Sequence, residues 1–369
     1  MKIIVLGTRG FPNVQGGVET HCENLYPRLA SLGCDVTVIT RRPYIDPRVT
    51  SYRGVRLIPL DCPRNKFLEA IVHTFKGVLL ARKMGCDILH IHAIGPALFV
   101  PLARLLGLKV VMTSHGPDYE RKKWNGMAKI VLKMGEWNGC VFANEIIAIS
   151  RTIADQIKRS YGREAVVIPN GVVVPRRLET DGALKQFGLE KGKYILAVGR
   201  FVPEKGFHDL LEAWRAAAAG WKLVIAGDAD HQDDYSKRLK EQARQTPNVV
   251  LTGFLTGRPL SEIYTHAGLF VLPSYYEGLP IVLLEAMSYG LSCIVSDIPP
   301  NREVALEDRR YFKPGDIDGM AKNIREFLSR PLTAQERSLQ TEQAAQKYDW
   351  DMIAEETLKV YGKAAGEKD

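Results

Sequence analysis

The sequence lacks the features that mark metal-bound, disulfide-linked and membrane-spanning proteins. Its six cysteines form no C-x-x-C pair and no metal-ligand spacing, which argues against a structural metal site and favours a reducing compartment. The most apolar long stretch, 93–113, is interrupted by two prolines, an arginine and a lysine, so we expect no transmembrane helix. The chain enters an apolar run at residues 2–7 without a leader pattern, and we expect no signal peptide. These absences predict a cytoplasmic protein.

Acidic residues are scarce in the first half of the chain. Residues 1–175 hold 24 Lys and Arg against 13 Asp and Glu, a net charge of +11, whereas the remainder holds 26 against 29, a net of −3. A basic half suggests an anionic partner. From charge alone that partner is a phosphate-bearing substrate, an acidic membrane surface or a nucleic acid.

Short apolar runs alternate with amphipathic segments along the chain, which is the pattern of parallel sheets covered by helices. With 369 residues, the chain is long enough for two domains. The expected strands lie at 2–7, 35–40, 55–59, 87–92, 109–113, 145–149, 165–168, 194–198, 222–226, 249–252, 269–273 and 293–296. The expected helices lie at 17–33, 67–84, 96–106, 125–139, 150–160, 206–218, 234–245, 259–266, 279–289 and 316–329.

The pattern predicts an α/β fold with two doubly wound, Rossmann-like domains that face a cleft. It breaks at 169–175, and residues 176–193 follow as a polar linker with a short helix. We therefore expect the domains at 1–170 and 171–349. A C-terminal helix over 350–365 is expected to pack back on the first domain, at the junction.

Glycines follow the first expected strand and open the first expected helix. The strand ends in the run Gly7-Thr-Arg-Gly10, and Gly16 and Gly17 lie at the start of the helix. Glycine lets the backbone approach a ligand closely, and a helix N-terminus favours a negative or hydroxylic group. The G-x-G-x-x-G spacing is missing, so the fingerprint of a nicotinamide dinucleotide site is absent. The alternative is a turn that serves packing only.

His115 follows the expected strand 109–113. Ligands bind at the carboxyl ends of strands in open α/β sheets, so this histidine is a candidate site residue. The alternative is a histidine that only caps its loop. His90 and His92 alternate along the preceding strand, where we expect one of them to be buried and assign a role to neither.

Arg200 and Lys205 lie where a strand ends and a helix begins, and both are next to glycines. Arginine can bind two phosphate oxygens and lysine adds a point charge, so the pair suits a diphosphate. The alternative is an exposed salt bridge with Glu204. Asp228 and Asp230 resemble a D-x-D metal motif, but we expect Asp228 to cap a helix and Asp230 to face solvent, with no metal required.

Two glutamates flank the run Gly-Leu-Pro-Ile-Val-Leu-Leu. If 279–289 is helical, Glu285 lies about two turns along from the turn that carries Glu277, and both carboxylates can point into one cleft. Carboxylates bind the hydroxyl groups of ribose and sugars. Together with the two cations, they predict a sugar-nucleotide site.

Two further segments combine apolar and basic residues. Helix 67–84 carries lysines and an arginine beside its apolar positions, and helix 125–139 is preceded by the basic, Trp-containing run 121–124. The ordinary interpretation is a pair of core-facing helices. The alternative is a surface that rests on anionic lipid.

Taken together, the motifs resemble retaining glycosyltransferases of family 4, which have the GT-B fold. The resemblance covers nearly the whole chain and rests on Gly16-Gly-Val-Glu19, Ser114-His-Gly116, Ile168-Pro-Asn-Gly171, Gly199-Arg with Glu204-Lys-Gly206, Ala226-Gly-Asp228, Gly253-Phe254, Pro273-Ser274 and Glu277-Gly-Leu-Pro with Glu285-Ala. The run from His115 to Trp124 is also similar to a bacterial polysaccharide subgroup that includes rhamnosyltransferases. The chain departs from the family pattern at Val173, where an aspartate is common.

The resemblance implies a role for each matching residue. Arg200 and Lys205 would bind the donor diphosphate, and Glu285 would hold the ribose hydroxyls. Glu277 and the backbone of Gly278, Leu279 and Pro280 would hold the donor sugar, and His115 would face it. The last implied contacts are Gly16 and Gly17 at the diphosphate and acceptor, and Gly253, Phe254 and Leu255 near the base.

The implied activity is sugar transfer from a nucleotide-diphosphate sugar to a lipid-linked or polysaccharide acceptor. It needs no cofactor and no metal, involves no nucleic acid, and would take place at the inner face of the membrane. The sequence leaves two alternatives open. One is a sugar-nucleotide epimerase on the same fold, and the other is a non-catalytic basic module that binds lipid or nucleic acid.

Overall fold

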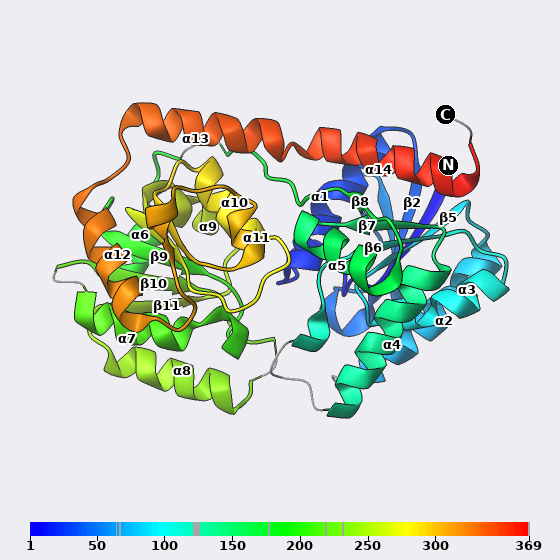
Figure 1. Ribbon diagram of the computed structural model, residues 1–369, viewed down its shortest axis with the longest axis horizontal. Helices are drawn as coiled ribbons and strands as arrows, with labels where there is room; N and C mark the ends of the chain where they lie inside the picture. Colours follow the sequence, from blue (N-terminus) through cyan, green and yellow to red (C-terminus); the bar gives the residue numbers. More distant parts are fainter. Residues whose placement is uncertain are drawn as a thin grey trace. The chain divides into compact units, whose positions relative to one another are not determined.

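The computed structural model describes residues 1–63, 65, 68–120, 126–175, 178–217, 220–230 and 232–367. The chain divides into two compact units, Met1–Gly171 with Trp350–Asp369, and Val172–Asp349. Each unit contains a parallel sheet with helices packed against it (Figure 1). The predicted α/β class and its two doubly wound sheets are confirmed.

The first unit begins with a strand whose apolar residues are all buried. Ile3, Ile4, Val5 and Leu6 are fully enclosed because strands on both sides and helices on both faces cover this strand. The elements of the unit are β1 (Lys2–Leu6), α1 (Gly17–Ser31), β2 (Asp35–Arg41), η1 (Arg42–Tyr44), β3 (Ser51–Tyr52), β4 (Val55–Leu60), α2 (Leu68–Met84), β5 (Ile88–His92), η2 (Pro96–Phe99), α3 (Val100–Leu105), β6 (Val110–Ser114), η3 (Asp118–Glu120), α4 (Gly126–Phe142), β7 (Glu145–Ala148), α5 (Arg151–Tyr161), β8 (Val166–Val167) and α14 (Trp350–Ala365), where η denotes a 3₁₀ helix.

The strand order of the first sheet is β3-β4-β2-β1-β5-β6-β7-β8. Its pairs are parallel except for β3, which runs antiparallel to β4. Helix α3 packs between α2 and α4, whereas α14 packs against α1 and against strands β5 to β7 (Figure 1). The last helix of the chain therefore completes the unit with which the chain begins.

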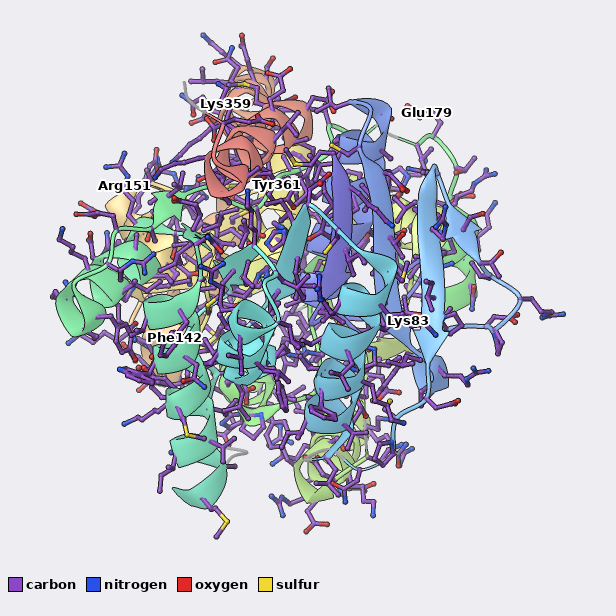
Figure 2. All side chains as sticks on the ribbon, turned by 90° about the vertical axis from the view of Figure 1, so that its right-hand side faces the viewer. Lys83, Phe142, Arg151, Glu179, Lys359 and Tyr361 are labelled. Carbon is purple, nitrogen blue, oxygen red and sulfur yellow. The ribbon has the colours of Figure 1, made fainter. Side chains whose placement is uncertain are left out.

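One end of α14 meets the segment that closes the first unit. A Cβ atom at Gly171 would lie 2.5 Å from the indole of Trp350, so only glycine fits there. Further along the helix, Ile353 and Tyr361 are buried at helical spacing. Figure 2 shows Tyr361 on the inner side of α14 and Lys359 on its outer side.

The second unit has the strand order β11-β10-β9-β12-β13-β14, and its strand pairs are parallel. Strand β9 lies between β10 and β12, so the loops that follow these three strands are neighbours at one edge of the sheet. Its elements are α6 (Gly182–Phe187), β9 (Tyr194–Val198), η4 (Pro203–Lys205), α7 (Phe207–Ala217), β10 (Lys222–Ala226), α8 (Asp234–Gln245), β11 (Val249–Gly253), α9 (Gly257–His266), β12 (Leu269–Leu272), α10 (Ile281–Ser288), β13 (Cys293–Ser296), α11 (Pro299–Arg302), η5 (Asp308–Arg310), β14 (Tyr311–Phe312), α12 (Ile317–Ser329) and α13 (Ala334–Lys347).

The expected elements are present, with ends that shift by a few residues. The expected helix 96–106 is wrong as one element, because it is a 3₁₀ turn followed by a short α-helix that has a proline in its first turn. The short strands β3 and β14, the short helix α11 and the polar helix α13 were not predicted from the sequence. A capping box between Thr333 and Glu336 marks the start of α13, but the helix buries little apolar surface. The basic run 121–124 lies outside the described residues.

Candidate functional site

In the second unit, the loops after β9 and β12 bring a lysine and a glutamate together. The Lys205 Nζ atom lies 2.6 Å from Glu277 Oε1, and the hydroxyl of Ser274 donates to the same oxygen at 2.6 Å. The two charged side chains are 16% and 9% exposed. The pair is thus partly buried at the carboxyl end of the sheet, where ligands bind in open α/β folds.

Backbone and side-chain contacts hold these two loops against each other. The amide of Tyr275 donates to the carbonyl of Glu204 at 2.8 Å, and the Tyr275 hydroxyl donates to Asp209 Oδ2 at 2.6 Å. Gly206 has a φ of +66°, and a Cβ atom there would lie 2.1 Å from the carbonyl oxygen of Pro273. The positions of Lys205 and Glu277 are therefore set by the fold around them.

Arg200 binds a different carboxylate. Its Nη1 lies 2.9 Å from Asp230 Oδ2, in the loop after β10. The alternative of an exposed salt bridge with Glu204 is wrong, because Glu204 is buried and the two cations pair with Asp230 and Glu277.

One expectation for the D-x-D motif, the helix cap at Asp228, is wrong. Asp228 caps no helix: it pairs with Lys240 at 2.7 Å, and helix α8 is capped by Asp233. Asp230 is exposed, as expected, and its carboxylate also binds Arg200. Among the residues that the structure describes, no group of three or more His, Cys, Asp or Glu side chains could hold a metal ion.

Glu285 lies in α10, half-buried, and accepts a hydrogen bond from the Tyr264 hydroxyl at 2.9 Å. Burial raises its pKa to about 7, although the Tyr264 hydrogen bond acts in the opposite direction. Helix α10 begins at Ile281, so the expected start at 279 is wrong and Leu279 and Pro280 belong to the preceding loop with Gly278. Glu277 and Glu285 therefore bind different partners.

The segment expected near the base joins the same edge of the sheet. Strand β11 ends at Gly253, which has a φ of +73°, and the carbonyl of Gly253 accepts from the amide of Gly227 at 2.9 Å. Phe254 is exposed and Leu255 is half-buried. The exposed ring of Phe254 thus lies in the loop after β11, and the neighbouring loop after β10 carries Asp230.

In the first unit, an ion pair fills the turn around Gly16 and Gly17. Glu19 accepts from the backbone amide of Arg9 at 3.0 Å and from its Nε at 3.2 Å. Gly16 has a φ of +150°, which residues with a Cβ atom rarely adopt, so glycine is favoured there. A buried carboxylate at the N-terminus of α1 is electrostatically favourable. Sequence reasoning missed this pair, although Glu19 is part of the Gly-Gly-Val-Glu motif.

His115 follows β6 directly and is half-buried. Its Nε2 lies 3.0 Å from Nδ1 of His92, and its ring meets that of His21 edge to face at 5.1 Å. His21 belongs to α1, so His115 lies beside the helix that Gly17 opens. The expectation that only one of His90 and His92 is buried is wrong, because both are fully enclosed.

Comparison with known proteins identifies the kind of molecule. Residues 182–348 match the family model described as glycosyl transferases group 1, and residues 15–176 match that of glycosyltransferase family 4. The chain is a glycosyltransferase with the GT-B fold. This result favours a transferase over the epimerase and the non-catalytic module that the sequence left open.

Individual relatives align with most of this chain. A glycogen synthase from Mycobacterium tuberculosis is 28% identical over 407 aligned residues, which cover 98% of this chain and 94% of the relative. A putative teichuronic acid biosynthesis glycosyltransferase from Bacillus subtilis is 24% identical over 81% of each chain. The crystal structure of Anabaena HepE in complex with UDP-glucose has a TM-score of 0.80 at 18% identity, covering 98% of this chain and 100% of the other.

The site residues thus form a group in each unit. Arg200, Lys205 and Glu277, with Glu285 in the helix that follows, belong to the second unit, and Gly16, Gly17 and His115 belong to the first. Sequence reasoning did not anticipate their partners, which are Asp230, Ser274, Tyr264, His92 and the pair of Arg9 and Glu19. Most of these partners are distant in sequence and meet only through the strand order.

Proposed function

We propose that this glycosyltransferase moves a sugar, with retention at the anomeric carbon, from a nucleotide-diphosphate sugar to a lipid-linked or polysaccharide acceptor in bacterial surface glycan synthesis. The observation that carries the proposal is the partly buried pair of Lys205 and Glu277 at the carboxyl end of β9 and β12. A diphosphate needs fixed cations and a sugar needs fixed hydrogen-bond acceptors, and this pair provides one of each.

The donor diphosphate would bind Arg200 and Lys205. An ammonium group has three N–H donors, so Lys205 can bind Glu277 and phosphate oxygens together. The guanidinium of Arg200 can bind two phosphate oxygens, either after its ion pair with Asp230 is broken or while one of its N–H groups still binds Asp230. In this proposal the two cations stabilise the charge that grows on the departing diphosphate, and no metal is required.

The remaining donor contacts come from the loops around this pair. Glu277 and the backbone of residues 278–280 would hold the sugar, and Glu285 would accept from the ribose hydroxyls. The exposed ring of Phe254, with Gly253 and Leu255, would lie near the base. In the first unit, His115 would face the transferred sugar, and Gly16 and Gly17 would border the diphosphate and the acceptor.

Retention follows if the acceptor attacks the face from which the diphosphate leaves. In that route the glycosyl–oxygen bond breaks towards an oxocarbenium-like centre, and the departing phosphate takes the acceptor proton. The alternative route to retention uses a carboxylate nucleophile close to a second carboxyl group. In the structure, Glu277 is bound by Lys205 and Ser274, which favours a role in holding the sugar.

Replacement of the cations tests the donor site. We expect Arg200→Ala and Lys205→Ala to abolish transfer and to remove the thermal stabilisation that the matching nucleotide diphosphate gives the wild type. Arg244→Ala, which removes an exposed cation from α8, is the matched control and should behave like the wild type. Full activity of both site variants in folded protein would contradict the assignment.

The donor and the stereochemistry need separate measurements. A thermal-shift panel of UDP, GDP and dTDP sugars identifies the base, and NMR of the product shows whether the anomeric configuration is retained. An incubation without acceptor distinguishes transfer from epimerisation, since an epimerase would convert the donor alone.

A surface on the first unit supports a membrane-bound acceptor. Along α2 and α4, apolar side chains at helical spacing are exposed, with Met127 at 78% and Ile130 at 67%. The carboxylates on these helices are buried: Glu69 pairs with Arg41, and Glu136 accepts from tyrosine hydroxyls. The α2–α4 surface consists of Leu68, Phe75, Lys76, Leu79, Lys83, Met127, Lys129, Ile130, Lys133, Met134 and Trp137. Its exposed charges are positive.

We propose that the α2–α4 surface rests on an anionic bilayer, as suits a lipid-linked acceptor. Figure 2 shows α2, which ends near Lys83, and α4, which ends at Phe142, on the side away from Lys359. Among the described residues, no helix is long and apolar enough to span a membrane. The relative in Bacillus subtilis is named for teichuronic acid synthesis, which agrees with a surface-glycan role.

Vesicle flotation tests this contact. The protein should float with vesicles that contain anionic lipid and stay behind with neutral ones. The reversal Lys129→Glu with Lys133→Glu should remove binding, whereas Lys359→Glu on α14 should not. Equal binding by the two variants would contradict the assigned surface.

A further inference from the structure

A cluster of buried imidazole and hydroxyl groups lies behind His115 in the first unit, and the proposed reaction assigns these groups no role. The side chains come from separate elements: α1, β5, β6 and α14. They are Tyr26, His90, His92, Thr113 and Tyr361, and each is at most 1% exposed. Such burial of polar groups is costly unless each one is hydrogen-bonded.

The hydrogen bonds form one continuous path that ends at His115. Its Nε2 lies 3.0 Å from His92 Nδ1, and His92 Nε2 contacts the hydroxyl of Tyr26. That hydroxyl lies 2.9 Å from His90 Nδ1, which in turn lies 2.6 Å from the hydroxyl of Tyr361. His90 Nε2 meets Thr113 Oγ1 at 2.7 Å. The rings of His90 and His92 stack at 4.2 Å.

Burial favours the neutral form of His90 and His92. Burial lowers the pKa of His90 to about 3, and burial together with the neighbouring imidazoles lowers the pKa of His92 well below its ordinary value. A neutral imidazole has one N–H donor and one lone pair. Because both nitrogens of His92 have partners, one must donate and the other must accept. The direction of its bond to Tyr26 therefore sets the direction of its bond to His115.

The distances around His90 indicate this direction. Its Nδ1 faces two hydroxyls but can make only one strong hydrogen bond, and the shorter contact is the one with Tyr361. The proton of Tyr26 is then available to His92 Nε2. If His90 Nδ1 carries a proton instead and donates it to Tyr26, the hydroxyl of Tyr26 still donates to His92. These two arrangements of His90 give the same result at His92, whereas a Tyr26 hydroxyl that donated to Tyr361 would reverse the bond between His92 and His115.

We propose that this path fixes the tautomer of His115. Tyr26 donates to His92 Nε2, the Nδ1–H of His92 donates to His115 Nε2, and the proton of His115 is held at Nδ1. Tyr26 and His92 are thus positioning residues. The consequence for catalysis rests on the proposed function: His115 presents an N–H donor to the sugar, and it is not the base that takes the acceptor proton.

NMR of the full chain with ¹⁵N-labelled histidine tests the assignment directly. Ring-nitrogen shifts distinguish a protonated nitrogen from one with a lone pair, and signals are assigned with His92→Asn and His115→Gln. We expect a protonated Nδ1 and an unprotonated Nε2 on His115, with a coupling across the hydrogen bond to His92 Nδ1. A proton on His115 Nε2 would overturn the inference.

Variants test the positioning role. In Tyr26→Phe and His92→Phe we expect His115 to become a mixture of tautomers and kcat to fall about tenfold, the value of roughly one hydrogen bond. His92→Asn should restore much of the loss, because its amide can donate from the position of Nδ1. Tyr52→Phe is the control, since that hydroxyl donates to Glu23 outside the cluster.

The two proposals fail in different ways. An unchanged His115 spectrum and unchanged kcat in Tyr26→Phe would reject the positioning role in an active transferase. A wild-type spectrum as expected, in a chain that transfers no sugar from any donor, would instead reject the proposed function and leave the tautomer assignment standing. The wild-type spectrum decides the assignment even if a variant fails to fold.

Discussion

Removal of the Asp230 carboxylate should strengthen donor binding. In the structure Asp230 Oδ2 lies 2.9 Å from Arg200 Nη1, and the two side chains are 21% and 20% exposed. If Arg200 binds the donor diphosphate, the phosphate must compete with this carboxylate for the guanidinium. Asp230→Asn keeps the size of the side chain and removes the competing charge.

The size of the gain follows from the ion pair that is broken. The interaction free energy of a partly exposed ion pair is only about 0.2–1 kcal/mol, because water and salt screen the charges. We therefore expect the variant to bind the nucleotide diphosphate up to about fivefold more tightly. Isothermal titration with the diphosphate from the thermal-shift panel measures the change, and the gain should shrink as salt is added.

Asp228→Asn is the matched control, because Asp228 lies in the same loop but pairs with Lys240 on α8. Its affinity for the diphosphate should stay at the wild-type value. The gain should also vanish when Arg200→Ala is combined with Asp230→Asn. Unchanged or weaker binding by Asp230→Asn alone would refute competition at Arg200.

Two further predictions concern stability. The folded pKa of Glu285, about 7, lies above its ordinary value of 4.5, so the folded state resists ionisation and loses stability as pH rises from 4.5 to 7. As pH rises from 5 to 8, the unfolding free energy of Glu285→Gln should therefore increase relative to that of the wild type by on the order of 2 kcal/mol, as measured by urea unfolding. A difference between variant and wild type that does not change with pH would contradict the raised pKa. Gly171→Ala should lose about 1–3 kcal/mol because its Cβ would strike Trp350, whereas Gly126→Ala, with open space around it, should be nearly neutral in the same assay.

The sequence was sufficient for the alternation of strands and helices, since short apolar runs such as 3–6 are typical of strands buried on both faces. It was also sufficient to place Arg200, Lys205 and Glu277 at strand ends. It did not reveal which charges would pair. Asp230 meets Arg200, and Glu277 meets Lys205, because β9 lies between β10 and β12, and that order depends on packing across the whole sheet.

The same reason explains the missed histidine path. His90 and His92 are two residues apart on one strand, and such side chains point to the same face, so their shared face was predictable from the sequence. Their partners were not, because Tyr26 and Tyr361 come from helices at opposite ends of the chain. Helix α13 was missed for a different reason: it is polar almost all round, and only its capping box marks it.

The placement of α14 has a consequence for synthesis on the ribosome. The first unit needs Trp350 and Tyr361 to fill its core, yet these residues are translated after the whole of the second unit. The second unit, over Val172–Asp349, is complete earlier and can fold while the nascent chain is still growing. Part of the interior of the first unit therefore stays unfilled until α14, which is made after the second unit, has left the exit tunnel.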